Sequence, residues 1–285
     1  MYENAPQADR PAWAIAPENA AGRCGDFIRA TLEAAGHGRL VVGLSGGIDS
    51  AVAAGLAARA VGPQNVLGVL MPYATSSAAS VTDAAAVAAV LGLRTETVPI
   101  TPMVDAFLAA MPGADPVRRG NVMARCRMVV LYDRSARDQA LVLGTGNRTE
   151  ALLGYTTLYG DSACALNPIG QLYKTEVRLL GAWLGLPPAV LAKAPSADLW
   201  EGQADEDELG FTYAEADGLL HHLVDQELGP RRLQALGYNP ALVERIAARM
   251  AAMAFKRRQP PVAEFPGRRD PDDPRADRPA DGGFH

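Results

Sequence analysis

Short apolar runs alternate along the chain with longer segments that have helical character. Continuous apolar runs of this length are typical of strands covered on both faces, and they predict strands at residues 40–45, 66–71, 95–100 and 140–144. The intervals are amphipathic or rich in alanine, and they predict helices at about 50–61, 79–92, 103–111 and 118–138. This alternation predicts an α/β protein with a doubly wound, mostly parallel sheet and helices on both of its faces.

Beyond the last predicted strand the pattern indicates helices only. We expect them to pack around the sheet without a core of their own, at about 174–185, 213–227 and 240–255. Residues 1–20 contain three prolines and no periodic pattern, and residues 266–285 combine proline, glycine and mixed charge. Such compositions favour disorder. We therefore expect a flexible N-terminal arm over 1–20, a single domain over 21–265 and a disordered tail over 266–285.

Composition and charge narrow the class of protein. The chain has 285 residues, 48% of them hydrophobic, which is enough to bury a large core. Its net charge of -5 argues against a large nucleic-acid surface. No leader peptide and no apolar run long enough to span a membrane are evident. The three cysteines lie far apart without a C-x-x-C motif, which favours a reduced, cytoplasmic protein without a structural zinc site.

The segment after the first predicted strand carries the first candidate chemistry. It reads Ser45-Gly46-Gly47-Ile48-Asp49-Ser50 and leads directly into a helix. Glycines allow the backbone to approach a ligand closely, and N–H groups at the start of a helix favour an anion at that point. No lysine follows the glycines, so the motif is not a Walker loop. The alternative is a plain strand-to-helix turn in which Asp49 caps the helix.

Two acidic residues extend this candidate site. An acid beside a phosphate is repulsive unless a cation lies between them, which favours Asp49 as a magnesium ligand. The last predicted strand runs into "TGNRTE", so Glu150 is expected on the opening turn of a helix at the same edge of the sheet. Two carboxylates from separate strand ends can share magnesium and nucleotide phosphates. Taken alone, Glu150 is equally a first-turn acid that interacts with the helix dipole.

These motifs resemble those of a known family. The S-G-G-x-D-S turn resembles the pyrophosphate loop of the N-type ATP pyrophosphatases, which cleave ATP between the α- and β-phosphates. With "TGNRTEALLGYTTLYGD", "LNPIGQLYKTEV" and "KAPSADLWEGQADEDELG", the chain resembles the ammonia-dependent NAD synthetases from about residue 20 to residue 262. The resemblance implies ATP-dependent amidation of deamido-NAD with ammonia, through an acyl-adenylate, to give NAD, AMP and pyrophosphate.

The resemblance also implies roles for individual positions. Asp49 and Lys174 would act in catalysis, and Asp49 and Glu150 would bind Mg²⁺. The residues implied to contact ATP are Gly43, Leu44, Ser45, Gly46, Gly47, Ile48, Asp49, Ser50, Thr145, Lys174 and Ser196. Those implied to contact deamido-NAD are Arg125, Asp161 and Lys256. For each cation taken singly, an ordinary surface charge is the alternative.

Three positions depart from the pattern of many family members. Leu158 stands in place of a lysine and Ala165 in place of an acid, both of which are expected to touch the dinucleotide, and Phe255 stands in place of a histidine. The segments "TLYGD" and "FKRRQ" look more like the synthetase domains of glutamine-dependent members. These departures bear on which carboxylate the protein amidates.

The family pattern also implies partners. It implies a homodimer with the dinucleotide near the subunit interface. The glycine turn begins by residue 43 and the segment after residue 262 is short and polar, so we expect no glutaminase, and ammonia would come from solution or from a separate protein. Neither nucleic acid nor a membrane is expected as a partner. The alternatives are another adenylating amide synthetase of this fold, a tRNA-thiolating enzyme, and a non-catalytic nucleotide-binding module.

Overall fold

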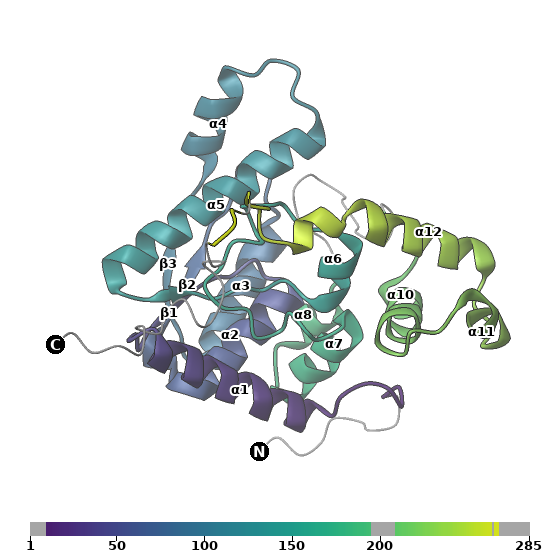
Figure 1. The fold of residues 1–285 in the computed structure, drawn as a ribbon. Helices are drawn as coiled ribbons and strands as arrows, with labels where there is room; N and C mark the ends of the chain where they lie inside the picture. The colour runs from purple at the N-terminus through teal and green to yellow at the C-terminus, as the bar shows by residue number, and fades with distance from the viewer. Residues whose placement is uncertain (1–9, 195–208, 264, 268–285) are drawn as a thin grey trace.

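A four-stranded parallel sheet forms the centre of the molecule (Figure 1). The structure is a computed structural model that describes residues 10–194, 209–263 and 265–267. The strand order is β3-β2-β1-β4 and every neighbouring pair is parallel. The strands are β1 (Leu40–Gly43), β2 (Val66–Leu70), β3 (Arg94–Thr97) and β4 (Leu141–Val142). The predicted doubly wound α/β fold is confirmed, and the carboxyl ends of the strands meet at one edge.

The outer strands are shorter than the apolar runs that predicted them. β4 has two residues, but the chain continues in the same direction, because Leu143 forms a bridge with Leu166 and the Gly144 N–H donates to Leu166 O at 2.7 Å. β3 is a mostly exposed edge strand, and Val98 N–H still donates to Leu70 O at 2.8 Å beyond its end. Beyond β3 and β4 the backbone therefore stays hydrogen-bonded to the sheet as it continues into the loops at the carboxyl edge.

Four helices cover one face of the sheet. They are α1 (Pro17–Ala34), α2 (Ile48–Val61), α3 (Ala78–Leu91) and α7 (Lys174–Trp183), and the short α8 (Pro188–Ala192) packs beside α7. Leu40 and Val42 of β1 share this core with Ile28, Val52 and Leu180. All five side chains are fully or almost fully buried, so this layer holds α2 and α7, which both begin at the carboxyl edge.

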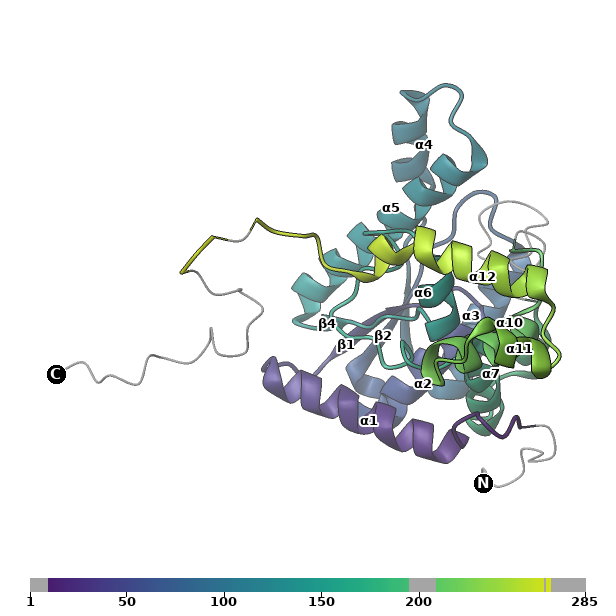
Figure 2. The ribbon, with the colours of Figure 1, turned by 45° about the vertical axis from the view of Figure 1, so that its right-hand side comes forward.

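The opposite face is covered by α5 (Pro116–Asp138), from which α4 (Thr101–Ala109) projects (Figures 1 and 2). Val41 points into this second layer, where it packs with Val69, Met123 and Val130. Successive residues of β1 thus face opposite cores, which explains why the strand is apolar at every position rather than alternating. The helices predicted at 50–61, 79–92, 103–111 and 118–138 correspond to α2, α3, α4 and α5, with ends that differ by a few residues.

The C-terminal helices have a core of their own, and the prediction that they would lack one is wrong. The elements are α6 (Arg148–Leu153), α10 (Tyr213–Leu220), α11 (Pro230–Ala235), α12 (Pro240–Ala252) and a π-helical turn over His221–Asp225. Leu153, Leu219, Leu233 and Ile246 are completely buried in this cluster. These helices bury their apolar faces against one another, beside the sheet layers (Figure 2).

The N-terminal segment is packed against the domain from residue 13 onward. Trp13 stacks on His221 with ring centroids 5.3 Å apart and meets Tyr173 edge-on at 5.5 Å. Ile15 N–H donates to a carboxylate oxygen of Glu176 at 2.7 Å, and Ala14 is buried. The flexible arm expected over residues 1–20 therefore does not extend through these positions. Residues 1–9, and all but 266 and 267 of the expected tail, lie outside the described residues.

No helix in the described ranges is both long enough and apolar enough to cross a bilayer. The longest, α5, has 23 residues and is interrupted by several arginines. Cys24, Cys126 and Cys164 are free thiols.

Replacing Trp13 tests whether the N-terminal segment belongs to the folded unit. We expect Trp13→Ala to lower the free energy of unfolding by about 1–3 kcal/mol, because it removes a half-buried aromatic side chain from two ring contacts. Chemical denaturation measures the change. Ile15→Ala is the matched control: its side chain is 42% exposed and its main-chain hydrogen bond is kept, so stability should change by less than about 0.5 kcal/mol. Equal stability of both variants and the wild type would contradict the packed segment.

Candidate active site

A cavity of about 580 Å³ opens at the carboxyl edge of the sheet. Its walls come from the turn after β1, the loop after β2, the first turn of α3, the loop after β4 and the end of α12. Ligands of doubly wound proteins bind at this edge. The cavity therefore lies where the fold predicts a site, and it is large enough for a nucleotide.

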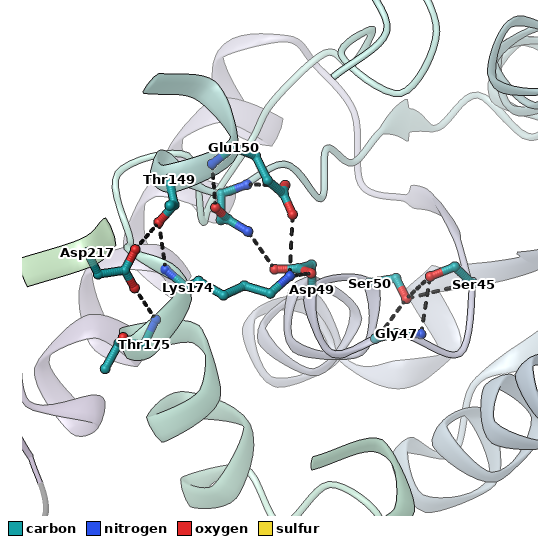
Figure 3. Close-up of polar contacts among 10 residues, drawn as sticks. Ser45, Gly47, Asp49, Ser50, Thr149, Glu150, Lys174, Thr175 and Asp217 are labelled. Atoms are coloured by element: carbon teal, nitrogen blue, oxygen red, sulfur yellow. Dashed lines mark hydrogen bonds and ion pairs between the residues drawn. The ribbon is translucent and has the colours of Figure 1, made fainter. Parts of the chain in front are cut away.

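The glycine turn is closed by two hydroxyl groups. The Ser45 and Ser50 hydroxyls are 3.0 Å apart, Ser45 N–H donates to the Ser50 hydroxyl at 3.2 Å, and Ser50 donates to Gly47 O at 3.0 Å (Figure 3). The turn ends at Ile48, where α2 begins. The first N–H groups of a helix have no acceptor within it, so this turn directs main-chain donors toward the cavity.

Gly46 is the position at which the turn requires glycine. Its φ is +77°, and a Cβ atom built there would lie 2.2 Å from the backbone oxygen of Ser80 in α3. Gly47 has a φ of -93°, and a Cβ there would meet only the Ser45 hydroxyl, at 3.3 Å. The close approach of the turn to α3 therefore depends on the missing side chain of Gly46.

Lys174 joins the two predicted carboxylates. Its Nζ forms an ion pair with Asp49 Oδ2 and lies 3.3 Å from Glu150 Oε1 (Figure 3). The lysine is 3% exposed, and its Nζ lies 5.1 Å from the centre of the Tyr213 ring. The first turns of α2, α6 and α7 lie at the carboxyl edge, and each supplies one residue to a single charged cluster.

Asn147 connects the same two acids, and the sequence reasoning overlooked it. Its side-chain amide donates to Asp49 Oδ1 at 2.9 Å, while its N–H donates to Glu150 Oε2 at 3.2 Å. Its side-chain oxygen accepts from the Glu150 N–H at 2.9 Å, which completes a capping box at the start of α6. The N-x-x-E spacing in "GNRTE" is the local signal that indicates this cap.

The cluster contains two acidic side chains and one cationic side chain. Burial, followed by the neighbouring charge of Asp49, raises the pKa of Glu150 well above its usual range, and the Lys174 ammonium offsets part of this effect. A divalent cation would relieve the remaining repulsion, and Mg²⁺ is commonly bound by one or two carboxylates together with substrate phosphates and water. The described residues contain no group of three or more acidic, histidine or cysteine side chains that could hold a metal. The donor set therefore fits an ion shared with a phosphate ligand.

A buried acid, Asp217 of α10, fixes the elements that carry Glu150 and Lys174. It is completely buried and accepts from the Thr149 hydroxyl at 2.6 Å and from Thr175 N–H at 2.7 Å. The Thr149 hydroxyl in turn accepts from Lys174 N–H at 3.0 Å (Figure 3). Desolvation raises the pKa of Asp217, and these donors lower it in part. Nothing local in the sequence indicates this contact.

The other predicted site residues divide between the cavity and its surroundings. Thr145, Asp161 and Lys256 line the cavity with the residues of the glycine turn, except Gly46, which faces α3 instead. Lys256 donates to the carbonyl oxygens of Gly154 and Thr156, at 2.9 and 2.7 Å, and burial lowers its pKa. Asp161 accepts from Thr156 and Thr157, both at 2.7 Å.

Arg125 lies outside the cavity lining. It is exposed on α5 and donates to Leu158 O at 3.2 Å. The three departing positions, Leu158, Ala165 and Phe255, are also absent from the lining, and Phe255 is 60% exposed. Ser196 and the acidic run 205–208 fall outside the described residues.

These features are typical of α/β proteins that bind nucleotide phosphates at the carboxyl edge of the sheet. The sequence profile of the NAD synthase family matches residues 21–260, and the chain belongs to that family. The NH(3)-dependent NAD(+) synthetase of Pelodictyon phaeoclathratiforme is 49% identical over 242 residues, which cover 85% of this chain and 87% of the relative.

Two solved structures share the fold over their whole length. The NH3-dependent NAD synthetase of Campylobacter jejuni, solved with a nitrate ion, superposes with a TM-score of 0.75 at 35% identity and covers 88% of this chain and 100% of its own. The NMN synthetase of Francisella tularensis superposes with a TM-score of 0.78 at 33% identity, with coverages of 88% and 100%.

A pair of glycine substitutions tests the geometry of the turn. Gly46→Ala forces a Cβ into the Ser80 backbone and strains the chain at positive φ, which costs about 1–3 kcal/mol before the clash is counted. We expect its affinity for ATP to fall by at least about tenfold and its melting temperature to decrease. Gly47→Ala has room for its methyl group, so it should keep the fold. Calorimetric titration with ATP measures both variants, and equal affinities would contradict the proposed turn.

Proposed function

We propose that the protein catalyses the ATP-dependent amidation of deamido-NAD with ammonia to give NAD, AMP and pyrophosphate. The observation that carries this proposal is the Asp49–Lys174–Glu150 cluster beside the glycine turn, in a chain that belongs to the NAD synthase family. Asp49 and Lys174 are the proposed catalytic residues. The residues Gly43–Ser50, Thr145, Lys174 and Ser196 are proposed to contact ATP.

The difficulty of the reaction is electrostatic. The nicotinate carboxylate attacks the α-phosphorus of ATP, pyrophosphate leaves, and ammonia then displaces AMP from the acyl-adenylate to form the amide. A carboxylate must approach a polyanion, so the site has to neutralise charge on the phosphates. Main-chain N–H groups of the turn and the Lys174 ammonium stabilise the charge that develops on the leaving group.

Asp49 and Glu150 are the proposed Mg²⁺ ligands. When bound, the ion would supply positive charge to the phosphate oxygens and to the leaving pyrophosphate. Asn147 keeps both carboxylates in position through one side chain and one main-chain N–H. Lys174 keeps them together before substrate arrives, which preorganises the site.

The dinucleotide acceptor is proposed to lie along the loop over residues 154–161. Asp161 and Lys256 hold this loop from inside the cavity, and Arg125 anchors its outer side through Leu158. Leu158 and Ala165 lie outside the cavity lining, and at these two positions the protein lacks a cation and an acid that many family members carry. These positions are therefore where acceptor preference would differ.

An assay of product formation tests the function and the two carboxylates together. Wild type supplied with ATP, Mg²⁺, ammonium and deamido-NAD should form NAD, AMP and pyrophosphate in equal amounts, identified by mass spectrometry. Asp49→Asn and Glu150→Gln should each lower kcat by at least about 100-fold, and chelation of Mg²⁺ should abolish turnover. The control Asp26→Asn changes an acid with a 77% exposed side chain and should have no effect.

A second candidate is amidation of another carboxylate, in particular the mononucleotide counterpart of deamido-NAD. The similarity to the NMN synthetase of Francisella tularensis and the Leu158 and Ala165 departures favour including it. The same assay with nicotinate mononucleotide distinguishes the two. A higher kcat/KM for the mononucleotide would favour the second candidate. If neither acceptor supported ATP turnover, both candidates would be contradicted.

The protein is further proposed to be a cytoplasmic homodimer that takes ammonia from solution or from a separate protein. Support for the dimer comes from apolar side chains exposed on α4 and α5, namely Met103, Phe107, Val129 and Tyr132. Several exposed apolar side chains on adjoining helices are typical of a protein interface. Free cysteines support a reducing compartment.

Sedimentation of a charge variant tests the dimer. Val129 is 50% exposed on α5, and Val129→Arg would bury an unpaired charge if that face is an interface. We expect the dissociation constant of the dimer to rise by at least about 100-fold, because such a charge costs several kcal/mol. Val90→Arg is the control, since Val90 is 57% exposed on α3, on the opposite side of the sheet. Equal dissociation constants for both variants would contradict an α4–α5 interface.

A further inference from the structure

The chain places its lysines unusually. It has 27 lysines and arginines, and only three of them, Lys174, Lys193 and Lys256, are lysines. All three line the cavity at the carboxyl edge of the sheet. Arginine supplies the rest of the positive charge, so lysine is confined to the one region where a compact ammonium group faces the proposed nucleotide. Lys174 and Lys256 already have proposed roles, and Lys193 has none.

Lys193 follows α8 and reaches across to α3. Its Nζ lies 2.8 Å from Asp83 Oδ2 and donates to the Ser80 hydroxyl at 3.1 Å. The lysine side chain is 28% exposed, and the Asp83 side chain is 15% exposed. The ammonium is therefore held in a fixed place at the cavity wall and keeps access to the cavity.

Ser80 connects this lysine to the glycine turn. Its backbone oxygen is the atom that leaves no room for a side chain on Gly46, so the first turn of α3 lies directly against the proposed phosphate loop. Ser80 is buried, and its hydroxyl also accepts from Ser77 at 2.9 Å. Lys193 thus approaches the turn from the α3 side, whereas Lys174 approaches it from the α7 side.

We propose that Lys193 is a second phosphate-binding lysine of this site, which contacts the polyphosphate of ATP and the pyrophosphate that leaves. This inference rests on the proposed function and extends it to a residue that the sequence reasoning did not assign. Asp83 and Ser80 position the ammonium before the nucleotide binds. With Lys174 it places positive charge on two sides of the turn, which suits a ligand with several negative charges.

Calorimetric titration with magnesium pyrophosphate tests the proposal without turnover. Lys193→Ala should bind pyrophosphate about 10- to 100-fold more weakly than wild type, as expected for loss of a charge-assisted hydrogen bond to a phosphate. It should also raise KM for ATP and leave KM for the acceptor unchanged. Asp83→Asn is the matched variant: it removes the charge of the ion-pair partner but keeps the ammonium and a side-chain oxygen that can accept its hydrogen bond, so it should lose clearly less pyrophosphate affinity than Lys193→Ala.

The two variants separate a binding role from a structural one. If Lys193 served only to join α8 to α3, Lys193→Ala and Asp83→Asn would lower the melting temperature alike and would weaken pyrophosphate binding alike, which overturns the proposal. Unchanged affinity in Lys193→Ala, or no binding of pyrophosphate by wild type, also overturns it. The proposed function can also fail by itself. If wild type binds pyrophosphate, Lys193→Ala binds it more weakly and wild type forms no NAD, then the inference about Lys193 stands and the proposed function is contradicted.

Discussion

One ammonium group, that of the buried Lys174, joins two partly exposed carboxyl groups from separate parts of the chain in one cluster. Asp49 follows β1, Glu150 follows β4, and the Lys174 ammonium contacts both side chains and so offsets the repulsion between them. The parallel sheet makes the meeting possible, because it brings the ends of β1 and β4 to one edge. Two carboxyl groups beside one ammonium group suit a site that binds a cation together with phosphates.

Residues outside the cavity lining hold Lys174 in place. Asp217 accepts hydrogen bonds from both Thr149 and Thr175, so α10 of the C-terminal cluster fixes the starts of α6 and α7. Glu176 of α7 and Tyr173, which precedes α7, contact Ile15 and Trp13 of the N-terminal segment. The C-terminal helices and the segment around Trp13 are therefore parts of the support for the charged residues, and not separate additions to the sheet.

Local patterns were sufficient for the fold class and for locating the glycine turn at the carboxyl edge of the sheet. β1 and β2 were predictable because both of their faces are buried, and the glycine turn because two glycines stand between an apolar run and a helical segment. Asp217 and Lys193 were not predictable, since their partners lie 68 and 110 residues away, and such contacts leave no periodic signal. The C-terminal core was missed for a similar reason: its helices show apolar faces, but the sequence does not say whether those faces meet the sheet or one another. The positions of Arg125 and Leu158 outside the cavity lining likewise depend on the path of a loop.

The account depends on ATP being bound and cleaved at the Lys174 cluster, and the rate of AMP formation by Lys174→Gln tests this most directly. Glutamine removes the positive charge and keeps a polar side chain of similar length. With saturating ATP, acceptor and ammonium, the account predicts a rate at least about 100-fold below that of wild type, in a variant whose circular dichroism spectrum shows the native fold. AMP formation at the wild-type rate would contradict it.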